Sequence, residues 1–90
     1  MITIQTLDEN TFKVSVTHSG SSQHCVSLDH AFCKELTGSE SQKQRLIEAS
    51  FEFLLQRESN QSILKEFNLK LIGNYFPEYP SEMKKKFLLK

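Results

Sequence analysis

The chain has 90 residues, 38% of them hydrophobic and 24% charged, and its formal net charge is zero. This length suits one domain with a single core, so we expect residues 1–90 to form one domain. No run of about 18 apolar residues is present, which argues against a membrane-spanning helix. A neutral chain also lacks the broad positive field that is typical of nucleic-acid-binding domains.

The N-terminal stretch MITIQTLDEN has no basic region followed by an apolar run, so it does not resemble a secretory signal. The two cysteines, Cys25 and Cys33, match no metal-binding spacing. We therefore expect a cytoplasmic protein in which both thiols are reduced.

Residues 1–28 alternate between apolar and polar side chains, the pattern of half-buried strands. We predict three strands that form an antiparallel meander with one apolar face. The residues expected to share this face are Ile2 and Ile4, then Phe12, Val14 and Val16, and then His24, Val26 and Leu28.

The first turn of the meander is expected at residues 8–10. A three-residue loop whose last residue is left-handed suits the sequence DEN, because Asn tolerates positive φ. This loop pairs Ile4 with Val14 and Ile2 with Val16, so that the apolar faces coincide.

The second turn is expected in the polar stretch SGSSQ, which contains Gly20. A loop of this length pairs Val16 with Val26 and Val14 with Leu28, which again keeps the apolar side chains on one face.

After Leu28 the pattern becomes helical. Asp29 is a good N-cap for a short helix that ends at Gly38. A longer helix follows, with a possible capping box formed by Ser41 and Gln44 and no Gly or Pro before Ser59. Its main apolar stripe consists of Leu46, Ile47, Ser50, Phe51 and Leu54.

A short turn starting at Asn60 or Ser62 is expected to pass through Ile63, Leu64 and Phe67. Arg57 and Glu58, at the end of the long helix, are expected to satisfy terminal carbonyls and to cap or pair nearby, respectively.

Asn68 then caps a further helix, in which Gly73 is expected to permit close packing or a kink. Pro77 disfavours the helical conformation of Phe76 and so ends this helix. Pro80 fits the first turn of a last short helix. The fold predicted for the chain is α+β: a three-stranded antiparallel β-meander (1–28) followed by about four helices (29–90) packed on one sheet face.

No catalytic, cofactor-binding or metal site is predicted. In the expected hairpin, His18 and His24 face each other with His30 nearby, but no Asp, Glu or Cys completes a metal site. Cys25 and Cys33 occupy no catalytic motif, and the three glycines form no phosphate-binding loop. An enzyme is therefore not expected.

Residues 25–55 read as strand, short helix, turn and longer helix, which resembles the ribbon-helix-helix class of DNA-binding proteins. In that class, paired strands of two subunits enter the major groove. Ser39 and Ser41 would then lie near a phosphate. However, the outward residues of the strand include no Arg or Lys: they are Gln23, Cys25 and Ser27.

The segment from Leu46 to Tyr79 is similar to a family of small, uncharacterised bacterial proteins. The matching pattern is FLLxRES followed by IL, F, L, I and YFPEY. The resemblance implies an N-terminal β-meander with a helical C-terminal part, and it transfers no catalytic residue.

We predict a protein-interaction domain that binds another protein or itself. The stretch YFPEYP provides an aromatic edge and the basic run 84–86 an electrostatic rim. The predicted contact residues are Tyr75, Phe76, Tyr79, Lys84, Lys85 and Lys86. The alternative function is DNA binding, through a ribbon-helix-helix dimer or through the basic tail.

Overall fold

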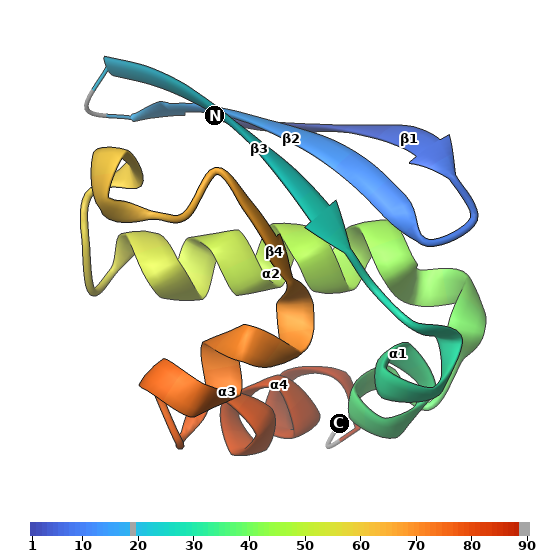
Figure 1. Ribbon diagram of the computed structural model, residues 1–90. Coiled ribbons are helices and arrows are strands. Elements are labelled where there is room, and N and C mark those ends of the chain that lie inside the picture. Colours follow the sequence, from blue (N-terminus) through green and yellow to red (C-terminus); the bar gives the residue numbers. More distant parts are fainter. Residues whose placement is uncertain (19, 89–90) are drawn as a thin grey trace.

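The computed structural model describes residues 1–18 and 20–88, and it contains one sheet with helices on a single face (Figure 1). The α+β class, the N-terminal meander and the four packed helices are as predicted. The elements are β1 (Ile2–Asp8), β2 (Thr11–His18), β3 (Gly20–Ser27), α1 (His30–Thr37), η1 (Glu40–Gln42), α2 (Lys43–Leu55), η2 (Asn60–Ser62), β4 (Glu66–Asn68), η3 (Leu69–Leu71), α3 (Ile72–Tyr75) and α4 (Tyr79–Phe87), where η marks a short 3-10 helix.

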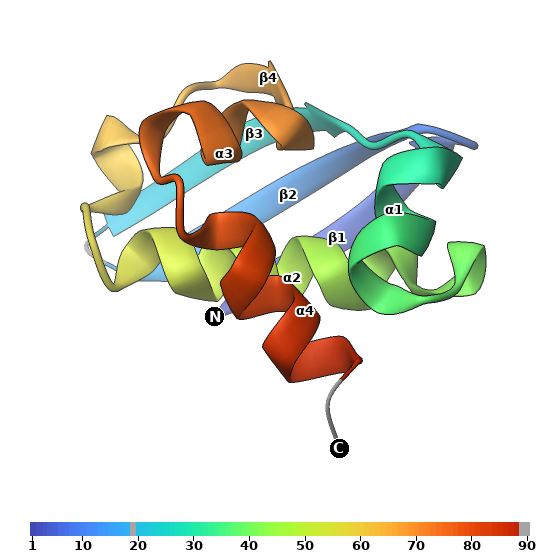
Figure 2. The ribbon, with the colours of Figure 1, turned by 90° about the horizontal axis from the view of Figure 1, so that it is seen from below.

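The core lies between the inner face of the sheet and α2. Alternating residues of β2 and β3, such as Val14 and Val26, are buried because their side chains share the face that the helices cover. Seven residues of α2 are buried as well, including all five of the predicted stripe, so this helix is central to the core. Figure 2 shows α4 packed over α2 on the side away from the sheet.

The pairing of β1 with β2 confirms the predicted register, with Ile2 opposite Val16 and Ile4 opposite Val14. The predicted turn is wrong. Asp8 pairs directly with Thr11 after a bulge, and no non-glycine residue in the described ranges has a positive φ. The turn is held by the Asp8 carboxylate, which accepts a hydrogen bond of 2.9 Å from the backbone N–H of Asn10. This bond lowers the pKa of Asp8.

The pairing of β2 with β3 differs from the prediction. Val14 lies opposite His24 and Val16 opposite Ser22, because the strands reverse between His18 and Gly20. Gly20 adopts a φ of 96°, which a glycine reaches without a steric penalty. The observed register differs from the predicted one by an even number of residues, so the apolar face is preserved.

A fourth strand, β4, was not predicted. It pairs in parallel with β3, with Val26 opposite Phe67, and the amide of Cys25 donates a 2.7 Å bond to the carbonyl of Lys65. Strand β3 therefore has a neighbour on each side, and β1 and β4 form the two edges of the sheet.

The boundaries of α1 are as expected, with Gly38, at φ 81°, at the C-cap and Asp29 at the N-cap position. The carboxylate of Asp29 makes no capping hydrogen bond and instead lies 3.4 Å from Nζ of Lys70. The predicted capping box before α2 is absent. Ser39 instead accepts a bond from the amide of Ser41, and Gln44 donates to the hydroxyl of Thr6 in β1 at 2.9 Å.

The C-terminal part follows the predicted stop signals. The side chain of Asn68 accepts a bond from the amide of Lys70 and so starts η3. Helix α3 ends before Pro77, with Phe76 in an extended conformation. Pro80 lies in the first turn of α4, as predicted.

Candidate ligand pocket

The three predicted aromatic contact residues lie in different environments. Tyr75 is 65% exposed, Phe76 is partly buried and Tyr79 is fully buried. The hydroxyl of Tyr79 is 2.6 Å from the hydroxyl of Ser50 in the core, so Tyr79 cannot touch a partner in this conformation. This finding corrects its predicted contact role. Its ring packs edge-on against Phe53, at 5.4 Å between centroids.

The three predicted lysines are exposed on α4. Two of them form ion pairs: Lys85 with Glu82 at 3.6 Å and Lys86 with Glu52 at 3.5 Å. None of the three lines the pocket described next. The structure thus brings Tyr75 and Phe76 together and leaves the lysines on another surface.

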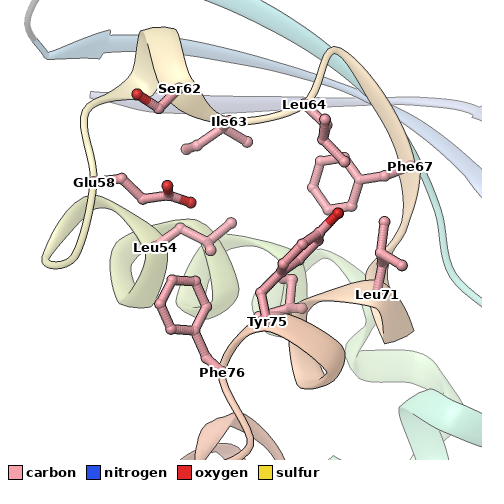
Figure 3. Close-up of a pocket in the computed structure, with 10 residues that line it drawn as sticks. Leu54, Glu58, Ser62, Ile63, Leu64, Phe67, Leu71, Tyr75 and Phe76 are labelled. Atoms are coloured by element: carbon pink, nitrogen blue, oxygen red, sulfur yellow. The ribbon is translucent and has the colours of Figure 1, made fainter.

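An open pocket of about 400 Å³ lies beside α2, between the segment that follows this helix, β4 and α3 (Figure 3). Two exposed apolar side chains, Leu64 at 46% and Tyr75 at 65%, lie on its rim. We call it the Leu64–Tyr75 pocket. Its lining residues are Leu54, Glu58, Ser62, Ile63, Leu64, Phe67, Leu71, Ile72, Tyr75 and Phe76.

Each wall of the pocket comes from a different element. Leu54 belongs to the last turn of α2, Phe67 to β4 and Tyr75 to α3. Helix α2 ends at Leu55, where the amides of residues 57 and 58 both turn back to the carbonyl of Leu54. This turn places the carboxylate of Glu58 in the pocket, facing the ring of Tyr75 (Figure 3).

Arg57, the neighbour of Glu58, is engaged outside the pocket. Its guanidinium lies 3.6 Å from the ring centroid of Phe53 and donates to the carbonyl of Phe53 at 3.1 Å. It also approaches the carboxylate of Glu78 at 3.4 Å. The predicted role of Arg57 at the carbonyls of the helix end is therefore confirmed.

A polar network holds the outer wall of the pocket against the sheet. Nδ1 of His24 lies 2.7 Å from the carbonyl oxygen of Leu64, and Nε2 lies 2.8 Å from the hydroxyl of Ser22. Because a carbonyl oxygen only accepts, Nδ1 of His24 carries a proton and donates it to Leu64. Asn60 donates to Ser22 at 3.0 Å and to the carbonyl of Gly20 at 3.3 Å.

This network surrounds a second, more polar cavity of about 370 Å³ between β3 and residues 60–65. His24 is only 2% exposed, and its ring lies 5.3 Å from that of Phe51. The histidine is thus a core residue that anchors the backbone of Leu64. Sequence reasoning missed this role because the partner is a backbone atom 40 residues away.

The predicted histidine pair is wrong, since His18 lies opposite Gly20 and His24 opposite Val14. Within residues 1–18 and 20–88, no group of three or more His, Cys, Asp or Glu side chains could hold a metal ion. Cys33 is buried in the core and Cys25 is partly exposed in β3.

The ribbon-helix-helix arrangement is not formed. In that class, the strand before the first helix pairs with a second subunit. Here that strand is β3, which already pairs with β2 and β4.

The chain was compared with protein families, curated proteins and solved structures. No family model, curated protein or solved structure matches the chain. No helix in the described part of the chain is long and apolar enough to cross a membrane.

Proposed function

We propose that this chain is a protein-interaction domain that receives side chains of a partner's peptide segment in the Leu64–Tyr75 pocket. The observation that carries the proposal is the pocket itself, an apolar hollow of about 400 Å³ with exposed Leu64 and Tyr75 on its rim. Recognition sites of this kind combine a concave apolar surface with a few polar groups.

The distribution of exposed apolar side chains supports this site over others. The large hydrophobic residues exposed in the described chain are Met1, Leu7, Leu64, Tyr75 and Leu88. Only Leu64 and Tyr75 of this set line the pocket. Aromatic residues such as Tyr75 and Phe76 are favoured anchors at interfaces because they bury a large area with few rotatable bonds.

Affinity capture with pocket variants tests this function. Leu64→Lys and Tyr75→Lys place a positive charge on the rim, where both side chains are exposed, so the fold should survive. A true partner is enriched from lysate by the unmodified protein and lost with both variants. It is retained by Gln5→Lys, a control of the same charge on the exposed residue Gln5 of β1.

Circular dichroism verifies that all three variants remain folded. If no enriched protein depends on both Leu64 and Tyr75, the proposed function is wrong. If enrichment depends instead on Lys84, Lys85 and Lys86, the binding surface is α4 and not the pocket.

A further inference from the structure

The carboxylate of Glu58 is the one acidic group among the residues that line the Leu64–Tyr75 pocket. It is partly buried, and it has neither an ion pair nor a side-chain hydrogen bond to any described residue. Figure 3 shows it turned into the hollow, with Leu54 and Ile63 on either side. A carboxylate that lies unpaired at the wall of an apolar hollow is suited to pair with a cation that enters it.

The neighbouring cation does not serve this purpose. Arg57 lies over the ring of Phe53 and approaches Glu78 instead. Of the carboxylates of Glu58 and Glu78, only that of Glu78 lies near the arginine. The charge of Glu58 remains available inside the pocket.

The remaining walls suit the stem of a long basic side chain. Phe67, Tyr75 and Phe76 contribute aromatic rings, whose faces attract a cation. Lys and Arg carry methylene stems that pack on apolar surface while the charged head reaches a polar partner. A volume of about 400 Å³ accommodates such a stem together with an apolar neighbour.

We propose that the segment bound in the pocket carries a Lys or Arg beside an apolar residue, and that Glu58 selects it by pairing with the basic head. This inference rests on the proposed function, since it specifies the chemistry of the partner at the same site.

Peptide selection tests the inference without knowledge of the natural partner. A library of random peptides displayed on phage is selected on the unmodified protein and counter-selected on Tyr75→Lys, whose positive charge opposes a basic ligand. Parallel selections use Glu58→Gln and, as a control with the same loss of charge, Glu48→Gln, which alters an exposed residue of α2 outside the pocket.

We expect peptides with a basic residue next to an apolar one from the unmodified protein and from Glu48→Gln, but not from Glu58→Gln. The best peptide is then synthesised with norleucine in place of the basic residue, which keeps most of the stem and removes the charge. Calorimetry should show affinity reduced about tenfold or more on the unmodified protein and unchanged on Glu58→Gln.

The possible failures are distinguishable. Pocket-dependent peptides without a basic residue, or a norleucine effect that persists in Glu58→Gln, overturn the role of Glu58 and leave the proposed function intact. If selection yields no peptide that Tyr75→Lys fails to bind, both proposals are overturned.

Discussion

At the scale of single residues, the hydroxyl of Tyr79 links α4 to α2 through the core. Ser50 donates to the carbonyl of Leu46 at 2.7 Å, so it accepts the proton of the Tyr79 hydroxyl. Tyr79→Phe removes this bond and should lower the free energy of unfolding by about 1 kcal/mol. Urea denaturation measures the loss, and Tyr75→Phe, at the exposed tyrosine, should leave the midpoint unchanged.

Burial also raises the pKa of the Tyr79 phenol above its ordinary value of 10.0. When the pH exceeds 10.0, the tyrosine of the unfolded chain ionises, while the buried tyrosine of the folded protein keeps its proton. The contribution of the protonated Tyr79 to the free energy of unfolding is therefore complete below pH 10.0 and is lost as the pH rises further. We expect the urea midpoint to fall more steeply with alkaline pH in the unmodified protein than in Tyr79→Phe. Parallel slopes would contradict this assignment.

Asn60 anchors the segment between α2 and β4 through its buried amide. Asn60→Ala removes the bonds to Ser22 and to the carbonyl of Gly20, and should cost about 2 kcal/mol in the free energy of unfolding. Gln61→Ala is the matched control. It removes one exposed bond, to the carbonyl of Ser21, and should cost less than about 0.5 kcal/mol. Thermal and urea denaturation compare the two variants.

The individual residues show where sequence reasoning succeeds. Pro77 and Gly38 act as predicted because their effects are local to the backbone. Tyr79 and Glu58 were misassigned, since an aromatic near two prolines and an acid after a helix each fit several environments. Tyr79 packs against Phe32 of α1 and Phe53 of α2, and Glu58 lines a pocket together with residues 62–76, so both environments are set by packing between distant parts of the sequence.

At the scale of elements, two glycines should respond to alanine in opposite ways. Gly38 ends α1 at φ 81°, and a Cβ there would lie 3.0 Å from the side chain of Leu88. Gly38→Ala should therefore destabilise the protein by about 1–2 kcal/mol. Gly73 in α3 has ordinary space for a Cβ, 3.7 Å from Pro80, and Gly73→Ala should stabilise it by about 0.5 kcal/mol. Changes of the same sign in the two melting temperatures would contradict this account.

In the strands, the periodicity of the sequence predicts which side chains face the core but does not determine the register. Alternation correctly assigns the inner face of β2 and β3, but it is equally satisfied by any even shift of register. The pairing of His18 with Gly20 fixes the observed register, whereas the sequence SGSSQ also permits a longer loop. Strand β4 has only three residues, too few for a periodic signal, and it exists because β3 offers a free edge.

At the scale of the whole molecule, residues 60–68 connect the sheet to the helical layer. His24 and Asn60 fasten one side of this segment to β3, and its other side forms a wall of the Leu64–Tyr75 pocket. The pocket could not be predicted from sequence because its lining comes from four separate stretches. Tyr75 and Phe76 were the predictable part, since exposed aromatics beside a helix end suggest a contact surface.

The charge distribution bears on the alternative function. Two lysines of the basic run pair with acids, Lys85 with Glu82 and Lys86 with Glu52, and the formal net charge is zero. Few phosphate contacts are therefore available. We expect the protein to elute from immobilised duplex DNA at low salt, well below about 0.15 M. Retention on the DNA at higher salt would contradict this expectation and would support the alternative function, DNA binding.

The central claim is that ligands enter the pocket between α2, β4 and α3, with Glu58 at its wall. The most direct measurement is a titration of the isotopically labelled protein with the selected basic peptide, followed by backbone amide NMR. We predict that the shifts concentrate at Glu58, Leu64, Phe67 and Tyr75 and leave the outer face of β1 unchanged. Shifts centred on β1 or on α4, with the pocket amides unmoved, would contradict the account.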